Sequence, residues 1–454
     1  MSKKKTAVLI LAAGLGTRMR SRLPKVMHPL AGRPMINHLM ETVDALSPEK
    51  VVVVVGDGMD AVTDAVSPYA TVVQKDRLGT AHAVLAARDA LGDFDGDVLV
   101  LYGDTPLLSE GTLRVMLAAR HSGDDPAVVV LGFRPNDPGA YGRLIQDPDG
   151  HLNRIVEAKD ATAEELDVDL CNSGVMAFDG PAMFDLLARI GNDNARQEFY
   201  LTDAVALARQ DGRSCHVVEG EPTELLGVNS RAELAVAEAL VQTDLRAKAM
   251  HGGATLMDPT TVYFSYDTAL GQDVLVGPSV VFGPGVRIGD DVEIKAFSHI
   301  EGATVDDGVS VGPFARLRPG ADVREGARIG NFVEVKKATI EPGAKVSHLT
   351  YIGDARVGAG ANVGAGTITC NYDGFFKSFT DIGANAFIGS NTALVAPVKI
   401  GDGAVVGAGS TITHDVDADA VSMTRAEQID RPGVAKIIRD HKAAKKAEQQ
   451  KKGR

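Results

Sequence analysis

Residues 276–300 read VGPSVVFGPGVRIGDDVEIKAFSHI and carry an apolar residue at every sixth position. The same spacing recurs, in several phases, from Phe264 to Ile412. A period of six fits neither an α-helix, which repeats about every 3.6 residues, nor a free strand, which alternates about every 2; it is the period of a hexapeptide β-helix. Antiparallel hairpins would require turn signals about every 8–12 residues. The sequence therefore predicts a parallel β-helix in which three hexapeptides make one coil.

The hexapeptide array contains one long interruption. The period breaks between Thr369 and Ile382, and residues 370–377 read CNYDGFFK. Insertions in solenoid proteins emerge on one face and often carry binding function. Polar residues near this break, among them His348 two positions past Val346, avoid the inward position and can project from the coil. A ligand site on the outside of the β-helix is the prediction.

The first part of the chain has a different pattern. Apolar runs alternate with helical stretches; the runs are 7–11, 51–55, 98–102 and 127–131, and the helical stretches include 35–46 and 81–91. This alternation predicts a Rossmann-like α/β domain with a mostly parallel sheet and ligands at the carboxyl ends of its strands. Asp104 follows the third run, where an unpaired carboxylate would be costly, and this favours a role as a cation ligand over a role as a helix cap.

A glycine-containing loop follows the first predicted strand. Gly14 and Gly16 allow backbone N–H groups to approach a polyphosphate, and Arg18 and Lys25 supply positive charge. The loop is not a Walker motif, because no Gly-Lys-Ser/Thr follows. Glycines after a strand are by themselves a weak signal for nucleotide binding.

Four segments are expected: a nucleotide-binding domain at 1–229, a linker helix at 230–253, the β-helix at 254–430 and a tail at 431–454. Ser230 and Glu233 form a capping box that predicts the start of the linker helix. The tail has nine Lys and Arg residues against two acidic ones, and a disordered end is expected.

Composition narrows the classes of function. The net charge of −13 argues against general nucleic-acid binding. The three cysteines lack metal-ligand spacing and make no disulfide framework, which indicates a reducing compartment. No stretch approaches the about 20 apolar residues that span a bilayer, so a cytoplasmic protein without membrane insertion is expected.

Several short strings together resemble a known family. The N-terminal strings resemble sugar-1-phosphate nucleotidyltransferases: G-x-G-T-R-M at 14–19, Pro24-Lys25, Gln74, Leu78-Gly79-Thr80, Tyr102-Gly103-Asp104, Tyr141-Gly142-Arg143, Glu157, Asn172 and Gly227-Val228-Asn229. With the hexapeptide array, the chain resembles the bacterial bifunctional N-acetylglucosamine-1-phosphate uridyltransferase/glucosamine-1-phosphate N-acetyltransferase family. The resemblance covers nearly all of the chain except the basic tail, and it implies a left-handed β-helix and a role in peptidoglycan synthesis.

The resemblance implies attack of a sugar-1-phosphate on the α-phosphorus of UTP, with Mg²⁺ held by Asp104 and Asn229. Arg18 and Lys25 would act on the phosphates as catalytic cations. Uracil would be read by Gln74, Gly79 and Thr80, and the N-acetylated sugar by Gly142, Glu157 and Asn172. The full set for UTP and UDP-N-acetylglucosamine is Leu11, Ala12, Ala13, Gly14, Lys25, Gln74, Gly79, Thr80, Tyr102, Gly103, Asp104, Gly142, Glu157, Asn172 and Asn229.

For the β-helix the resemblance implies acetyl transfer from acetyl-CoA to glucosamine-1-phosphate, with His348 as the base, in sites shared between neighbouring chains of a homotrimer. Histidine suits this role because the amine must lose a proton near neutral pH. The sugar phosphate would be bound by Arg318, Lys336, Tyr351, Asn362 and Lys377. Acetyl-CoA would be bound by Ala365, Asn371, Tyr372, Ser390, Ala408 and Arg425, with Asn371 also orienting His348.

Two alternatives stay open on the sequence. The first is a nucleotidyltransferase whose β-helix serves only oligomerisation or regulation; Arg318, Lys336, His348 and the insertion argue against it, because a scaffold needs none of them. The second is a non-enzymatic hexapeptide scaffold, which does not explain Asp104 or the glycine loop.

Overall fold

The computed structural model describes residues 5–452, and its chain divides into two compact units. The first unit contains Met1–His251 and Tyr263–Thr268, and the second contains Gly252–Val262 and Ala269–Arg454. The expected linker helix is α9, Arg231–His251, and it belongs to the first unit rather than standing between two domains. Its Leu234, Ala237 and Val241 pack against Leu30 and Val228.

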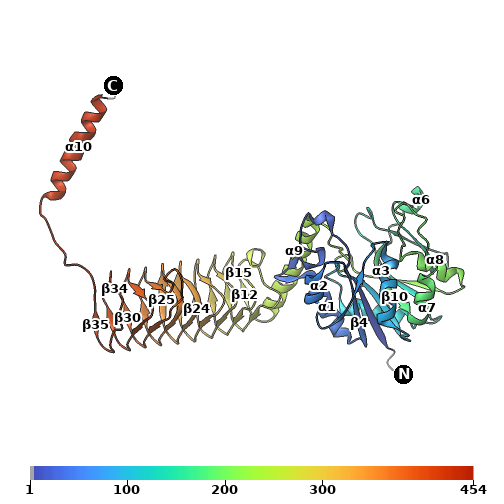
Figure 1. The fold of residues 1–454 in the computed structure, drawn as a ribbon, viewed down its shortest axis with the longest axis horizontal. Helices are drawn as coiled ribbons and strands as arrows, with labels where there is room; N and C mark the ends of the chain where they lie inside the picture. Colours follow the sequence, from blue (N-terminus) through green and yellow to red (C-terminus); the bar gives the residue numbers. More distant parts are fainter. Residues whose placement is uncertain (1–4, 453–454) are drawn as a thin grey trace. The chain divides into compact units, whose positions relative to one another are not determined.

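The first unit is built on a mostly parallel sheet, as the sequence predicts (Figure 1). The strand order is β11-β7-β10-β6-β1-β4-β5, and only β10 in this row runs antiparallel to its neighbours. The strands are β1 (Thr6–Leu11), β4 (Lys50–Gly56), β5 (Ala70–Gln74), β6 (Asp97–Tyr102), β7 (Val128–Phe133), β10 (Cys171–Asp179) and β11 (Cys215–Glu219). A hairpin of β8 (Arg143–Gln146) and β9 (Leu152–Val156) joins the sheet through β10.

Helices cover both faces of this sheet because alternate strand residues point to opposite sides. Ala7 and Leu9 of β1 belong to one core, and Val8 and Ile10 belong to the other. The first core includes residues of α3 (Thr80–Ala86), α7 (Gly180–Leu187) and α8 (Asp203–Gln210); the second includes residues of α1 (Met35–Leu46) and α5 (Glu110–Ala119). The shorter elements are β2 (Pro29–Leu30), β3 (Arg33–Pro34), α2 (Asp60–Ala65), α4 (Arg88–Leu91) and α6 (Ala163–Leu166).

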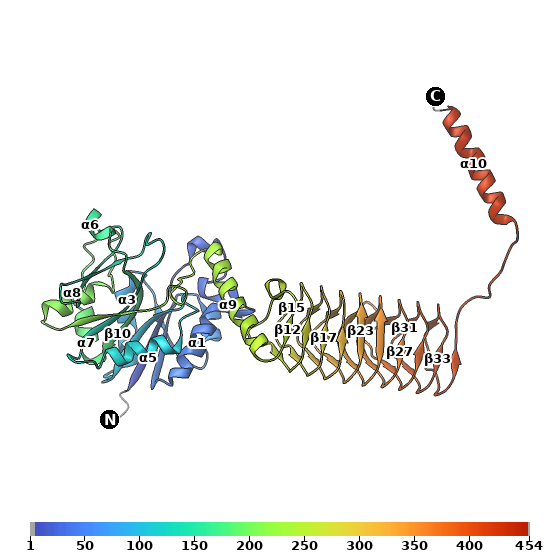
Figure 2. The same ribbon diagram turned by 180° about the vertical axis from the view of Figure 1, so that it is seen from behind.

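The second unit is a left-handed parallel β-helix that runs from β12 (Thr255–Leu256) to β35 (Val421–Ser422) (Figure 2). Its strands pair in parallel with residues one coil away, as in Val276↔Ile294 and Phe282↔Ile300. Eighteen positions separate these partners, which is three hexapeptides. The predicted inward residues are buried except Leu270, which is half-buried in an early coil, so the period and the three-sided coil are confirmed.

The strands of the middle coils either carry the predicted acetyltransferase residues, as for Lys336, His348, Tyr351 and Asn362, or end one or two positions before them, as for Arg318, Ala365, Asn371, Tyr372, Ser390 and Ala408. They are β21 (Arg316–Leu317), β23 (Arg328–Asn331), β24 (Glu334–Ile340), β25 (Lys345–His348), β26 (Tyr351–Val357), β27 (Asn362–Val363), β28 (Ile368–Cys370), β30 (Phe387–Ile388) and β33 (Val405–Val406). The insertion lies between β28 and β29 (Thr380–Ile382).

The C-terminal tail differs from the prediction. Residues Val434–Lys452 form helix α10, so the expectation of disorder is wrong for them, while 453–454 lie outside the described residues. Residues 434–452 contain six Lys, four Ala and two Gln and no Gly or Pro, which gives this segment high intrinsic helix propensity. The expectation of disorder was based on the positive charge of the tail and did not take this helix propensity into account. Across residues 5–452 no helix combines the length and apolarity that a membrane span would need.

Candidate functional sites

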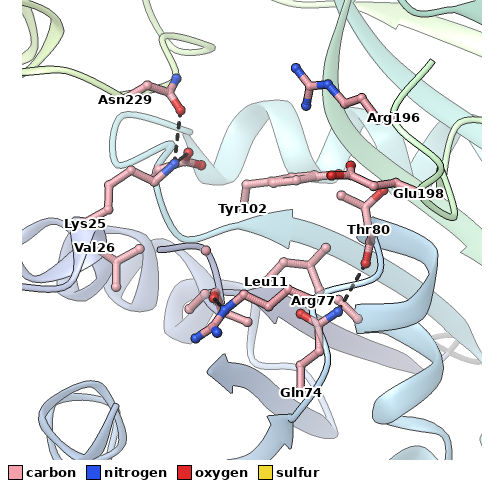
Figure 3. Close-up of a pocket in the computed structure, with 16 residues that line it drawn as sticks. Leu11, Lys25, Val26, Gln74, Arg77, Thr80, Tyr102, Arg196, Glu198 and Asn229 are labelled. Carbon is pink, nitrogen blue, oxygen red and sulfur yellow. Dashed lines mark hydrogen bonds and ion pairs between the residues drawn. The ribbon is translucent and has the colours of Figure 1, made fainter. Parts of the chain in front are cut away.

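A cavity of about 430 Å³ opens in the first unit at the carboxyl ends of β1 and β6 (Figure 3). Eleven predicted residues line it: Leu11, Ala12, Ala13, Gly14, Lys25, Gln74, Gly79, Thr80, Tyr102, Asp104 and Asn229. The sequence interpretation missed five other lining residues, Val26, Arg77, Ala83, Arg196 and Glu198. Nε of Arg77 donates to the carbonyl of Ala13 at 2.8 Å. The two residues are 64 positions apart, so no local sequence pattern predicts this contact.

The glycine loop requires its glycines for steric reasons. Gly16 has φ of 61°, and a Cβ there would lie 2.6 Å from Cβ of Lys25. Any other residue would therefore push Lys25 away from the cavity. Arg18, in the 3₁₀ turn Thr17–Met19 that follows, is exposed and is not among the cavity-lining residues.

Three polar groups from distant parts of the chain meet at one end of the cavity. The ammonium of Lys25 contacts Oδ2 of Asp104 and lies 3.1 Å from Oδ1 of Asn229. Asn229 is held by its own backbone N–H, which donates to Glu233 at 2.8 Å, and the N–H of Val228 donates to the carbonyl of Asp104 at 2.9 Å. Oδ2 of Asp104 and Oδ1 of Asn229 thus converge on the position that the Lys25 ammonium occupies. An Asp and an Asn oxygen, one of them charged, fit Mg²⁺, which binds through one or two protein oxygens plus phosphates and waters.

The opposite side of the cavity has the groups assigned to uracil. Gln74 is buried, and its amide donates to the carbonyl of Gly79 at 3.2 Å. Gly79 has φ of 121°, and a Cβ there would lie 2.5 Å from the carbonyl oxygen of Phe199. Burial raises the pKa of Tyr102, whose hydroxyl interacts with Thr80. Gln74 and Thr80 therefore present neutral amide and hydroxyl groups on this side, where the charged side chains of Arg77 and Glu198 also line the cavity (Figure 3).

The predicted sugar residues gather on β10 and the β8–β9 hairpin, although they do not line the same cavity. The N–H of Asn172 donates to the carbonyl of Gly142 at 2.8 Å, and a Cβ on Gly142 would lie 3.6 Å from the carboxylate of Glu157. Burial raises the pKa of Glu157.

Gly103 lies between Tyr102 and Asp104, and a Cβ there would lie 3.0 Å from Val26.

The β-helix arranges the acetyltransferase residues in two columns that run along its coils. The first is here called the His348 column. Its members each lie two positions after a strand residue, and these strand residues pair with one another from coil to coil. Val346 pairs with Val363, Val363 with Ile388, and Ile388 with Val406. The column is therefore Asn331, His348, Ala365, Ser390 and Ala408. Since neighbouring strands lie about 4.8 Å apart, His348 is one coil from Ala365.

Beyond the histidine, the His348 column carries small side chains. Ala365, Ser390 and Ala408 follow it in order, and Arg425 donates to the carbonyl of Ala408 at 3.0 Å. Tyr372, in the insertion, is exposed, and Asn371 beside it is buried.

The second column, here called the cation column, follows β21, β24 and β26. Arg318 donates to Glu334 at 2.8 Å, and Lys336 lies 3.2 Å from Asp354. Lys377 of the insertion comes close to Lys336, and the neighbouring Lys336 ammonium lowers the pKa of Lys377. Like charges held together in this way favour an anion between them, and a sugar phosphate suits them.

Tyr351 and Asn362 lie on either side of these columns. Tyr351 is half-buried at the start of β26, where a Cβ on Gly353 would lie 2.3 Å from its hydroxyl. Asn362, in β27, is half-buried one position before Val363. Tyr351 is therefore on a strand of the cation column, and Asn362 is on a strand of the His348 column.

Within one chain, Asn371 and His348 have different partners. The amide of Asn371 donates to Asp354. The histidine instead has Asn331 as its partner, with Oδ1 of Asn331 2.5 Å from Nδ1 of His348. Asn331, Glu334 and Asp354 were missed by the sequence interpretation. A signal existed for Asn331, because it occupies the same phase as His348 one coil earlier.

The two units define a transferase with two active sites, one for nucleotidyl transfer and one of the hexapeptide type. The MobA-like NTP transferase domain family matches residues 8–166, and the bacterial transferase hexapeptide (six repeats) family matches residues 267–302 and 379–414.

The chain is 64% identical over 447 residues to Bifunctional protein GlmU of Paramagnetospirillum magneticum, with 98% of this chain and 99% of that protein covered. It is 65% identical to Bifunctional protein GlmU of Rhodospirillum rubrum (96% and 98% covered) and 58% identical to that of Sphingopyxis alaskensis (98% and 99% covered). The chain belongs to the bifunctional GlmU family. It is an enzyme with uridylyltransferase and acetyltransferase activities, and the alternative of a purely structural β-helix is set aside.

Proposed function

We propose that this chain transfers an acetyl group from acetyl-CoA to glucosamine-1-phosphate and then a uridylyl group from UTP to the N-acetylated product, giving UDP-N-acetylglucosamine and pyrophosphate. Residues 254–430 would carry the first step and residues 1–229 the second. The observation that carries the proposal is that the middle coils present both the His348 column and the cation column, because the first step needs a base and a phosphate site.

A product assay tests the overall reaction. The purified chain, given glucosamine-1-phosphate, acetyl-CoA and UTP, should release CoA and pyrophosphate in equal amounts. Without acetyl-CoA, both products should be lost. UDP-sugar made from unacetylated substrate at the full rate would contradict the proposed order.

Uridylyl transfer on these residues needs alignment and charge neutralisation rather than a base. A phosphate monoester has its second pKa near about 6, so the attacking oxygen is already ionised at neutral pH. Lys25 and Arg18 would neutralise the phosphates of UTP, while Gln74, Gly79 and Thr80 hold uracil and Gly142, Glu157 and Asn172 hold the sugar. Asp104 and Asn229 would hold Mg²⁺, which when bound stabilises charge developing on the phosphates.

Acetyl transfer requires that the sugar ammonium lose a proton before its nitrogen can attack the thioester. Oδ1 of Asn331 is an acceptor only, so Nδ1 of His348 carries the proton between them and Nε2 has the free lone pair. The ammonium would first lose a proton to solvent, and Nε2 would take a second proton from the nitrogen as it attacks the acetyl carbon. The C–S bond would then break, and the CoA sulfur would leave with the proton that His348 had taken. Arg318, Lys336 and Lys377, with Tyr351 and Asn362, would hold the sugar phosphate so that its amine faces His348.

Asn331 is expected to act as a positioning residue. Its replacement by Ala should lower kcat for acetyl transfer about tenfold, because the imidazole loses the partner that fixes its tautomer and orientation. The KM for acetyl-CoA should change little. Steady-state assay of CoA release at varied acetyl-CoA measures both constants.

The conservative variant Asn331→Asp is the control for this role. A carboxylate can also accept from Nδ1–H, so kcat should stay within about threefold of the unsubstituted chain. Equal loss in Asn331→Asp and Asn331→Ala would show that the contact with His348 is not what matters.

The acetyltransferase site is proposed to be completed by neighbouring chains in a homotrimer. His348 is exposed, and the insertion presents Phe375 and Phe376 that are 86% and 74% exposed. Three further aromatic rings stack along one corner of the β-helix, Phe297 on Phe314 and Phe314 on Phe332, at centroid distances of 4.9 and 5.1 Å, and all three are about half exposed. A second and third copy would cover these apolar groups.

Sedimentation combined with activity tests the shared site. The molecular mass measured by sedimentation should be three times the 47.7 kDa of one chain. On dilution to single chains, acetyl transfer should fall while uridylyl transfer, which uses one chain, persists. Full acetyl transfer by a species with the mass of one chain would contradict the trimer.

A further inference from the structure

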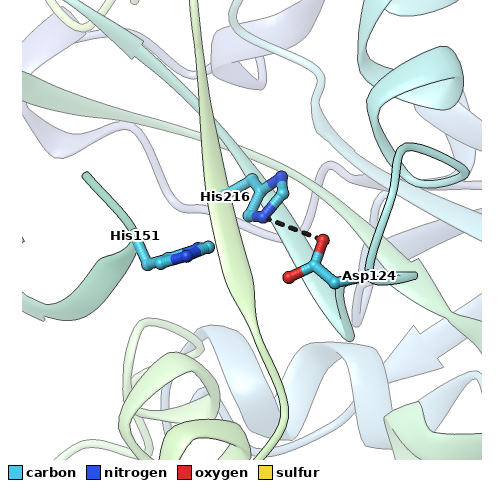
Figure 4. A group of neighbouring side chains, drawn as sticks. All are labelled: Asp124, His151 and His216. Atoms are coloured by element: carbon cyan, nitrogen blue, oxygen red, sulfur yellow. Dashed lines mark ion pairs between the residues drawn. The ribbon is translucent and has the colours of Figure 1, made fainter. Parts of the chain in front are cut away.

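Three side chains with metal-binding atoms meet in the first unit, away from the cavity described above (Figure 4). Asp124 lies in the turn between α5 and β7, His151 lies just before β9, and His216 lies in β11. One ligand atom from each falls within 4.8 Å of the other two. None of the three lines the uridylyltransferase cavity, so that reaction does not account for them.

His216 has an unsatisfied nitrogen at this place. Its Nε2 is buried and has no hydrogen-bond partner in favourable geometry, although Oδ1 of Asp124 lies 3.2 Å away. The ring of His151 faces it with 5.3 Å between ring centroids. A buried polar atom without a hydrogen bond is costly and calls for an explanation. A cation between the three groups would satisfy it.

One of the three separations matches that between ligands of a tetrahedral zinc ion. Zn²⁺ binds His nitrogen and Asp oxygen at about 2.0–2.2 Å, so two such ligand atoms lie about 3.4 Å apart. The observed 3.2 Å between Nε2 of His216 and Oδ1 of Asp124 is close to that value. His151 is half-buried, and rotation of its side chain would bring the remaining separations of up to 4.8 Å into range.

The backbone around the three residues is well held. Oδ1 of Asp147 accepts from the N–H groups of Asp149 and His151, at 3.1 and 2.9 Å, while its Oδ2 pairs with Arg209 at 2.9 Å. His216 is fixed by the pairing of β11 with β7. Such preorganisation lowers the cost of assembling a site.

Asp124 offers a carboxylate oxygen, and His151 and His216 each offer a ring nitrogen. Two imidazoles and one carboxylate favour Zn²⁺ over Mg²⁺, which prefers oxygen ligands alone.

We propose that Asp124, His151 and His216 form a zinc-binding site, with a water as the fourth ligand. The ion would fasten the closed end of the β8–β9 hairpin to the edge strand β11 and to the turn before β7. The open end of the same hairpin carries Gly142 and Glu157, so the site would stiffen the element that reaches the sugar-binding side. Zinc binding itself does not depend on the proposed function.

A metal titration of the full chain tests the site. The protein is stripped with a chelator and kept in excess Mg²⁺, so that sites with only oxygen ligands are filled. Addition of Co²⁺ should then give visible ligand-field absorption that saturates at one equivalent, and Zn²⁺ should remove it. Zn²⁺ should also raise the melting temperature.

Variants assign the signal to these residues. His151→Gln, at a half-buried position that tolerates change, should weaken Co²⁺ binding at least about tenfold, and His151→Gln with His216→Gln should abolish it. Circular dichroism checks that both remain folded. His414→Gln, at an exposed histidine of the β-helix, is the matched control and should bind as the unsubstituted chain does. Equal Co²⁺ spectra and equal Zn²⁺ shifts in the unsubstituted chain and in folded His151→Gln would overturn the proposal.

Discussion

Replacement of Asp104 by Asn is expected to lower the rate of uridylyl transfer about 10³-fold and to leave acetyl transfer unchanged. The carboxylate provides the charged one of the two oxygens that converge with Asn229 on a cation position. Metal-ion stabilisation of transition-state charge supplies several kcal/mol, and each 1.4 kcal/mol or so is about tenfold in rate. The amide keeps the shape of the side chain but removes the charge, so folding should be preserved.

Pyrophosphate release from UTP and N-acetylglucosamine-1-phosphate measures the effect, and the Mg²⁺ concentration for half-maximal rate should rise in Asp104→Asn. Asp89→Asn, an exposed position in α4, is the matched control and should behave as the unsubstituted chain. A slower reaction with an unchanged Mg²⁺ requirement would mean that Asp104 acts only by holding Lys25, its other contact.

Replacement of His348 by Ala is expected to lower acetyl transfer by about 10²- to 10⁴-fold, the usual contribution of a general base. Without Nε2, no group in the His348 column can accept the amine proton, because the other members are Asn331, Ala365, Ser390 and Ala408. His348 is exposed and supports no core packing, so the β-helix should remain folded. Uridylyl transfer from supplied N-acetylglucosamine-1-phosphate should keep its full rate.

CoA release and pyrophosphate release are measured on the same preparation. His299→Ala, at an exposed histidine in β18 (His299–Ile300), controls for the loss of an imidazole from the outside of the β-helix. The two units are compact by themselves, so each substitution should affect one reaction only. If both activities fell together in His348→Ala or in Asp104→Asn, the independence of the two sites would be wrong.

The repeat of the β-helix was readable in the sequence because each inward position is set by a local period. Val276, Phe282 and Ile288 must be apolar wherever the coil lies, since all point to its interior. The alternation of strands and helices likewise predicted the parallel sheet. The tail shows where composition misleads, because charge suggested disorder while Ala, Lys and Glu favour a helix.

The partners of site residues could not be read in the same way. Lys25 meets Asp104 across 79 positions and Asn229 across 204. Only the adjacency of β1 and β6 and the start of α9 bring these three residues together. Arg77, Arg196 and Glu198 were missed for the same reason, since no local pattern marks a residue whose role comes from packing beside the cavity.

The sequence by itself determined the two fold classes, the glycine loop and the histidine most suited to be a base, because these depend on residue type and short spacing. The tertiary structure decided which residues share a site. It put Asn331 on His348, aligned Ala365, Ser390 and Ala408 in one column, and gathered Asp124, His151 and His216. The physical reason is that strand pairing and coil stacking join residues far apart in the chain, and a one-dimensional pattern does not record such contacts.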